Sequence, residues 1–204
     1  MRPAREQPAG EQATGIVLAG GRSRRFGRDK LSELLDGRPL LHHPILALAA
    51  VCGEVIVAGP VHPASLPALP ELPIPLRVVG DPEPYGGPLV GLRAGLAAAR
   101  WPFALVAGGD MSHLAPALLA ELLRRLREGH EAVALRQGGQ LRPLPCALRT
   151  SALPAIERHL AIGRRSLHEV LEDVALRELD EAAWRPLDPD AGSLRDVDRP
   201  EDLG

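Results

Sequence analysis

Short runs of β-branched and aliphatic residues alternate along this chain with stretches of helical length, and this alternation restricts the possible fold more than any other feature. Units in which a strand, a helix and a second strand follow one another build a mainly parallel sheet with helices packed against it. The predicted strands cover residues 15–19, 54–58, 76–79, 103–107, 131–136 and 144–148. The predicted helices cover residues 39–51, 89–100, 115–128, 151–160 and 166–171. The sequence therefore predicts an α/β protein.

The chain has the length of one fairly large domain, at 204 residues, and no linker or repeat divides it. Residues 1–14 are polar and lack the apolar stretch of a secretory signal. We therefore expect a disordered tail over 1–14 and a single domain over 15–204. Residues 60–75 contain six prolines, which would interrupt a helix repeatedly, so a loop is expected there.

The balance of charges excludes several classes of protein. Lys and Arg total 24 and Asp and Glu total 26, a formal net charge of -2 without the basic excess of a nucleic-acid-binding protein. Aromatic residues, at 2%, are too few for a platform that stacks single-stranded bases. The longest apolar run, over 44–53, is too short to cross a bilayer, so no membrane segment is expected.

Two cysteines, Cys52 and Cys146, lie in apolar contexts far apart in the sequence. We interpret them as buried thiols of a protein in the reducing cytoplasm, with one structural disulfide as the alternative. Neither cysteine has a second one at the spacing of a zinc-ligand pair.

Three of the predicted strands end in glycine-rich or polar turns, at Gly20, Asp81 and Asp110. In an open α/β sheet, ligands bind outside the carboxyl ends of the parallel strands. We therefore expect these three turns to lie at one edge of the sheet and to form a single site.

The loop after the first predicted strand concentrates positive charge. Its sequence, over residues 18–30, is LAGGRSRRFGRDK, and it contains the one lysine of the chain. Two adjacent glycines allow a tight turn that brings backbone N–H groups close to a ligand. The five cations of the loop suit the oxygens of a triphosphate; they are Arg22, Arg24, Arg25, Arg28 and Lys30. The spacing is neither that of a Walker loop nor that of the Rossmann G-x-G-x-x-G motif.

This loop resembles the signature of the molybdenum cofactor guanylyltransferase family, L-A-G-G-x-S-x-R-x-G-x-D-K. The resemblance continues in the same order along nearly the whole chain. Further matching segments are RPLL followed by His43 (38–43), GGPLVGL (86–92), GDM (109–111), RPLP (142–145), GRRSL (163–167) and DVDRPEDL (196–203).

The resemblance implies a Rossmann-like, three-layer α/β/α sandwich whose mainly parallel sheet contains an antiparallel strand, the nucleotide-diphospho-sugar transferase fold. It also implies a set of nucleotide-binding residues, namely Leu18, Ala19, Gly20, Gly21, Lys30, Asp81, Pro88, Leu89, Gly91 and Asp110. Three residues are expected to be catalytic: Arg25 and Lys30 at the phosphates, and Asp110 as the ligand of Mg²⁺. Charge neutralisation at a reacting phosphate by Mg²⁺ on a carboxylate independently favours that role for Asp110.

Some of these carboxylates have alternative interpretations. Asp81 precedes a proline and is equally explained as a turn residue, and Asp110 as a turn residue or helix N-cap. Asp196 and Asp198 are candidates for a second metal ligand or for the start of a helix.

The chain also departs from the family pattern. Ala58 and Gly59 stand where the family often has Asn, Ser112 stands where it has Pro, and Phe26 replaces a Met. No charged catalytic group is lost, so we expect activity, and the departures bear on nucleotide affinity and selectivity. His43 and His113 are interpreted as surface or packing residues.

The activity implied by the resemblance is transfer of GMP from GTP to molybdopterin, with release of pyrophosphate. Relatives that use cytidine tend to have L-A-A-G and a proline before the loop lysine; Gly20-Gly21 and Asp29-Lys30 favour guanine instead. The alternatives are a cytidylyltransferase acting on the same cofactor or a related phosphate, and a non-catalytic cofactor-binding adaptor. The expected partners are GTP and the molybdenum cofactor, then other cofactor-biosynthesis proteins and recipient molybdoenzymes, without nucleic acid or membrane.

Overall fold

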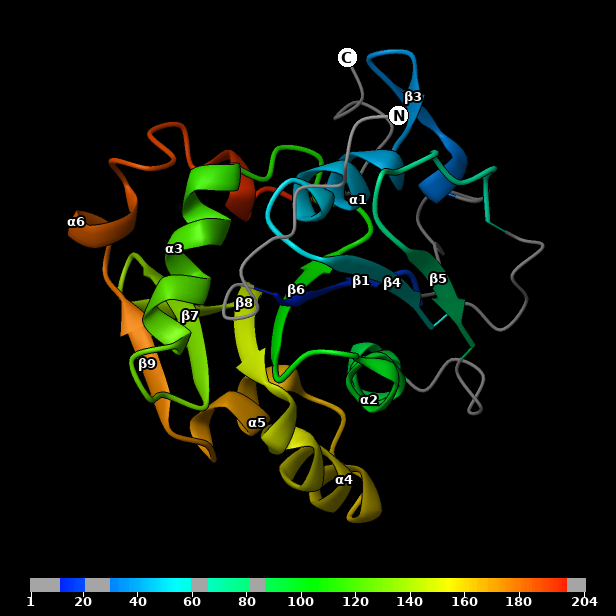
Figure 1. The fold of residues 1–204 in the computed structure, drawn as a ribbon. Coiled ribbons are helices and arrows are strands. Elements are labelled where there is room, and N and C mark those ends of the chain that lie inside the picture. The colour runs from blue at the N-terminus through cyan, green and yellow to red at the C-terminus, as the bar shows by residue number, and fades with distance from the viewer. Residues whose placement is uncertain (1–11, 21–29, 60–65, 81–86, 198–204) are drawn as a thin grey trace.

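The computed structural model describes residues 12–20, 30–59, 66–80 and 87–197, and seven strands of these ranges form one sheet in the order β5-β4-β1-β6-β8-β7-β9 (Figure 1). The strands are β1 (Thr14–Leu18), β4 (Glu54–Ala58), β5 (Leu76–Val79), β6 (Phe103–Gly108), β7 (Ala132–Gln137), β8 (Gln140–Arg149) and β9 (Leu176–Leu179). Neighbouring strands run parallel, except that β8 is antiparallel to both β6 and β7. The expected mainly parallel sheet with an antiparallel strand is thus confirmed.

Helices cover both faces of this sheet and complete three layers (Figure 1). One face carries α1 (His42–Ala49), α3 (Pro116–Leu126) and the short α6 (Glu181–Trp184), and the other carries α2 (Pro88–Ala98), α4 (Leu153–Ala161) and α5 (Leu167–Glu172). The pleat of β1 divides the core between them, because Val17 packs in the cluster under α1 and α3 while Ile16 and Leu18 pack under α2. The predicted sandwich is therefore correct. Among the described residues, no helix is long and apolar enough to span a membrane.

The folded part of the chain begins earlier than the sequence predicted. Thr14, which was assigned to the tail, is the first residue of β1 and is fully buried, and Ala13 is buried beside it. The hydroxyl of Thr14 donates a hydrogen bond of 2.8 Å to Oε1 of Glu54. A polar residue is accommodated in the core here because a carboxylate accepts its hydrogen bond. Residues 1–11 lie outside the described part of the chain.

Several short elements escaped the sequence prediction. β2 (Leu34–Leu35) and β3 (Arg38–Pro39) form an antiparallel hairpin, so α1 begins at His42 and not at residue 39. β9 and α6 each have four residues, too few for a periodic pattern to be read. Of the predicted proline-rich loop, residues 66–75 contain no helix or strand, as expected.

The two cysteines are free thiols on opposite faces of the sheet. Cys52 belongs to the cluster under α1 and α3, and Cys146 to the cluster under α2, α4 and α5. Burial raises the pKa of both thiols to about 12. The interpretation as buried thiols is confirmed, and the alternative of a disulfide is wrong because the sheet separates the two side chains.

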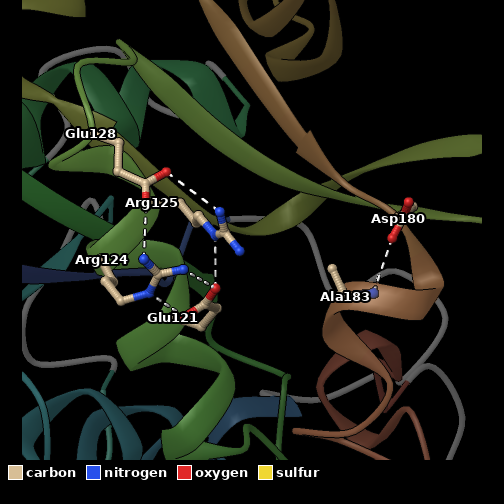
Figure 2. A network of polar contacts seen from close by, with 6 residues as sticks. All are labelled: Glu121, Arg124, Arg125, Glu128, Asp180 and Ala183. Atoms are coloured by element: carbon tan, nitrogen blue, oxygen red, sulfur yellow. Dashed lines mark hydrogen bonds and ion pairs between the residues drawn. The ribbon is translucent and has the colours of Figure 1, made fainter.

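The solvent-facing side of α3 carries a network of ion pairs (Figure 2). Arg124 donates to both oxygens of Glu121, at 2.7 Å each, and to Oε1 of Glu128 at 2.7 Å. Arg125 adds a bond of 2.8 Å to Oε1 of Glu121. Hydrogen bonds from Arg124, and then from Arg125, lower the pKa of Glu121 to about 2. These contacts fix the exposed face of the helix whose leucines pack on the sheet.

Candidate functional site

The carboxyl ends of β1, β4 and β6 are joined by hydrogen bonds between their turns. The N–H of Gly109 donates to the carbonyl of Leu18 at 2.9 Å, and the N–H of Ala19 donates to the carbonyl of Ala58 at 2.8 Å. The turns that contain Gly20 and Asp110 therefore meet at one edge of the sheet, as the sequence predicted. The third turn expected there contains Asp81, which lies outside the described residues, as do Gly21, Arg25 and Asp198.

Three glycines let the backbone pack closely at this edge. A Cβ atom on Gly20 would lie 3.2 Å from the carbonyl oxygen of Gly59, and one on Gly91 would lie 3.5 Å from that of Ala58. Gly59 has φ +106°, a conformation that other residues rarely adopt. The first turn of α2, with Pro88 exposed and Leu89 and Gly91 buried, therefore lies against the ends of β1 and β4. The sequence did not indicate Gly59 as a residue of this edge. The one signal was that Ala58 and Gly59 stand where the family often has Asn.

Lys30 is held by a short 3-10 turn, η1 (Lys30–Ser32), at the same edge. Its Nζ donates a hydrogen bond of 2.8 Å to Oδ2 of Asp110, and its side chain is 11% exposed. The turn is fixed because the N–H of Leu41 donates to the carbonyl of Leu31 at 3.2 Å. Leu31 also packs against Gly109, where a Cβ atom would come within 3.1 Å of its Cδ2. The structure thus brings two of the three predicted catalytic residues into direct contact.

Asp110 is the second residue after the end of β6 at Gly108, in the turn that also contains Gly109. Its Oδ1 lies so close to Gly108 that a Cβ atom there would be 2.7 Å away. Its carbonyl accepts a hydrogen bond of 3.1 Å from the N–H of Val197. Asp110 does not cap α3, because the N-cap position belongs to Ala115. The helix-cap interpretation of Asp110 is therefore wrong.

The oxygens at this edge suit a small, hard cation such as Mg²⁺. The side chain of Asp110 is 32% exposed, and Asp196 is exposed next to Val197, which bonds to Asp110. Among the described residues, no three His, Cys, Asp or Glu side chains are grouped as a metal cage. Mg²⁺ normally binds through one or two carboxylates together with waters and substrate phosphates. The residues present therefore fit a cation that is bound jointly with a phosphorylated substrate.

The two histidines near the site make structural or surface contacts. Nε2 of His43 lies 3.0 Å from the carbonyl oxygen of Leu35, and Nδ1 of His113 lies 2.7 Å from Oγ of Ser112. His43 is half-buried against the β2–β3 hairpin, whereas His113 is exposed. Neither contact makes the histidine a general base at Asp110.

Comparison with known proteins decides the family. Residues 15–181 match the family described as the MobA-like NTP transferase domain. The chain belongs to this family. A MobA-like relative from Chloroflexus aggregans, called a probable molybdenum cofactor guanylyltransferase, is 37% identical over 202 residues, which are 96% of this chain and 94% of that protein.

Solved structures show the same MobA-like fold. The molybdopterin-guanine dinucleotide biosynthesis protein A from Archaeoglobus fulgidus has a TM-score of 0.75 at 22% identity, over 93% of this chain and 94% of that one. A protein from Mycobacterium tuberculosis, solved as a complex with manganese, has a TM-score of 0.59 at 20% identity, over 83% and 87% of the two chains.

This MobA-like chain also contains buried polar residues near the site that the sequence did not indicate. Asp188 and Ser193 are both buried, in a segment that reads as an ordinary surface turn. Ser193 bonds to Ala115 and His113, 78 and 80 positions away in the chain, whereas Asp188 bonds to the backbone of the turn that contains Ser193. A single sequence contains no local signal for such contacts.

Proposed function

We propose that this protein transfers GMP from GTP to the terminal phosphate of molybdopterin, which forms the guanine dinucleotide cofactor and releases pyrophosphate. The observation that carries this proposal is the contact of Lys30 with Asp110 at the carboxyl ends of β1 and β6. A cation and a hard anionic ligand at one point are what nucleotidyl transfer needs. The names of the Chloroflexus and Archaeoglobus proteins support the choice of nucleotide and acceptor.

In the proposed reaction, an oxygen of the acceptor phosphate forms a bond to the α-phosphorus of GTP. The bond between that phosphorus and the pyrophosphate oxygen breaks, and pyrophosphate leaves with the electron pair. A phosphate monoester is ionised at neutral pH, so the chain does not have to supply a general base. This agrees with the structural contacts of His43 and His113.

The residues of the chain act mainly by positioning and by offsetting charge. Lys30 stabilises the negative charge on the phosphates, and Arg25 is proposed to add a second cation. Asp110 would hold Mg²⁺, which supplies further charge neutralisation when bound. The manganese complex of the Mycobacterium tuberculosis protein supports a divalent metal ion.

We place the nucleotide over Gly20 and Gly21, with Leu18, Ala19 and Asp81 beside it and the base near residues 87–91. The close packing of Gly20, Gly59 and Gly91 supports this position, because it leaves the backbone and not side chains to line the edge. We also propose that the enzyme works in the cytoplasm and that molybdoenzymes receive its product. The free thiols of Cys52 and Cys146 support a reducing compartment.

The test is pyrophosphate release by the purified protein with Mg²⁺ and molybdopterin, comparing GTP with CTP. We expect pyrophosphate release with GTP and not with CTP. The Asp110→Ala variant should release no pyrophosphate but should keep the thermal unfolding transition of the wild type. Preference for CTP would move the protein to a cytidylyltransferase activity. If folded protein releases no pyrophosphate with either nucleotide, the non-catalytic adaptor is favoured. Undiminished release by Asp110→Ala would contradict the metal assignment.

A further inference from the structure

The segment over residues 188–197 is organised by one buried carboxylate. Asp188 is 6% exposed. Its Oδ1 accepts from the N–H of Gly192 at 3.1 Å, and its Oδ2 accepts from the N–H of Ser193 at 2.8 Å. Both oxygens therefore bond within the same turn, which continues into the short 3-10 helix η4 (Gly192–Leu194). Asp188 fixes the shape of this turn.

Ser193 connects that turn to the chain just after Asp110. Its Oγ accepts from the N–H of Ala115 at 2.8 Å and donates to the carbonyl of His113 at 3.4 Å. Ser193 is fully buried. Gly192 fits so tightly that a Cβ atom on it would lie 3.0 Å from Cβ of His113. The turn is therefore packed closely against residues 113–115.

The end of the segment reaches Asp110 itself. The N–H of Val197 donates to the carbonyl of Asp110 at 3.1 Å, and Val197 packs with Leu35 and Leu40, which follow Lys30 in the chain. The same segment therefore contacts the surroundings of both charged residues of the site. Asp196 directly precedes Val197 in this segment.

Asp110 needs such support because of what precedes it. Two glycines, Gly108 and Gly109, come directly before it, and glycine leaves the backbone more conformational freedom than any other residue. Mg²⁺ accepts only a narrow range of ligand positions. A carboxylate that moves by a fraction of an ångström would bind the ion less well.

We propose that Asp188 and Ser193 are positioning residues for Asp110, which hold its carboxylate in place for the metal ion. This inference rests on the proposed function, since it requires a divalent cation at Asp110. It assigns no contact with substrate to either residue. Their effect passes through the turn over 192–197 to the carbonyl of Asp110 and to the backbone of residues 113–115.

The test uses Ser193→Ala, which removes only the hydroxyl group, and Asp188→Asn, which keeps the shape of the side chain. The matched control is Asp180→Ala. Asp180 Oδ1 accepts from the N–H of Ala183 at 2.9 Å and caps α6, so its loss also removes a carboxylate–backbone hydrogen bond (Figure 2). All three variants are expected to lose some thermal stability.

The first readout is the affinity for Mn²⁺ in the presence of GTP and without molybdopterin, measured by electron paramagnetic resonance of free Mn²⁺. Ser193→Ala and Asp188→Asn are expected to weaken this affinity by about five- to tenfold, the effect of losing one or two hydrogen bonds. Asp180→Ala should bind Mn²⁺ like the wild type. The second readout, amide hydrogen exchange of residues 109–115 without metal, should quicken in Ser193→Ala and not in the control.

Wild-type Mn²⁺ affinity and unchanged exchange in Ser193→Ala would overturn the inference, as would an equal loss of affinity in Asp180→Ala. Should Asp188→Asn fail to fold, Ser193→Ala still decides the question. Absence of Mn²⁺ binding by the wild-type protein is a different result. It would contradict the metal site of the proposed function, and the positioning role would fall with that site.

Discussion

Nζ of Lys30 lies 2.8 Å from Oδ2 of Asp110, although 80 positions separate the two residues in the sequence. The cation and the anion of the site therefore neutralise part of each other's charge before a substrate arrives. A triphosphate offers Lys30 a second anionic partner, and a metal ion offers Asp110 a second cationic one. We expect substrate binding to replace this contact.

Substitution of Lys30 should reduce catalysis strongly. Lys30→Met removes the charge that is proposed to stabilise the phosphates, and we expect kcat to fall by about 10²- to 10³-fold. Lys30→Arg should restore little, because a planar guanidinium does not fit the place of a compact ammonium group that is 11% exposed. Steady-state pyrophosphate release is the measurement. A kcat for Lys30→Met within threefold of the wild type would show that this residue has no role in the reaction.

Substitution of Gly59 should be harmful because of close packing as well as because of its positive φ. A Cβ atom on Gly59 would lie 3.1 Å from the backbone nitrogen of Gly20, so Gly59→Ala should cost about 1–3 kcal/mol of unfolding free energy. It should also raise KM for GTP, since it displaces the Gly20 turn. Urea unfolding and steady-state kinetics measure the two effects.

The control for this variant is Gly37→Ala. Gly37 also has a positive φ, +74°, but nothing lies within 4 Å of a Cβ atom placed on it. We expect a loss of about 1 kcal/mol without a change in KM. Equal effects of the two substitutions on KM would argue against close packing as the reason for glycine at position 59.

The α3 network predicts an acid-dependent contribution to stability. Because the pKa of Glu121 is lowered to about 2, its ionised form stabilises the folded state above the unfolded pKa, near 4.5. This contribution is lost as the pH falls through about 2. Glu121→Gln should therefore be less stable than the wild type at pH 7, by about 0.5–1 kcal/mol for a network of mostly exposed charges.

The stability difference between Glu121→Gln and the wild type should shrink as the pH falls from 4.5 towards 2, which denaturant unfolding at several pH values measures. Glu128→Gln is the comparison, since Glu128 is 40% exposed and should contribute less. A difference that is independent of pH would exclude the charge of Glu121 as its cause.

The buried thiols should be inert in the folded protein. Burial raises the pKa of Cys52 and Cys146 to about 12, so almost no thiolate forms at pH 8. A thiol reagent such as dithiobis(nitrobenzoic acid) should label neither cysteine in the native state and both in guanidinium chloride. Rapid labelling of the native protein would contradict this burial.

The parallel half of the sheet was predictable because each strand has its own local pattern. Residues 54–58 and 76–79 are strands with the predicted bounds, and the turns at Gly20 and Asp110 meet as parallel strand order requires. The prediction failed where elements are stabilised by distant contacts. Thr14 is the first residue of β1 and its hydroxyl bonds to the distant Glu54, and nothing next to it in the sequence indicates this.

In the candidate site, too, residues with a local sequence signal were predictable and residues that depend on distant contacts were not. Lys30 and Asp110 were identifiable because a charged residue after a glycine-rich strand end is a local signal. Asp188 and Ser193 were not, because Ser193 bonds to the distant residues His113 and Ala115, and Asp188 holds the turn that contains Ser193. Asp-Pro-Asp-Ala-Gly-Ser has the composition of any exposed turn. The residues that fix the backbone of a site are therefore found from tertiary contacts more readily than from sequence motifs.

The bond from Val197 to Asp110 joins two parts of the chain that are synthesised at different times. A ribosome releases the chain from its N-terminus, so β1, β4, β5 and β6 emerge, and can associate, well before residues 193–197 are translated. A nascent chain that has completed α3 already contains Lys30 and Asp110, yet lacks Val197, which bonds to the carbonyl of Asp110. The bond between Val197 and Asp110 can therefore form only after every strand of the sheet has been translated.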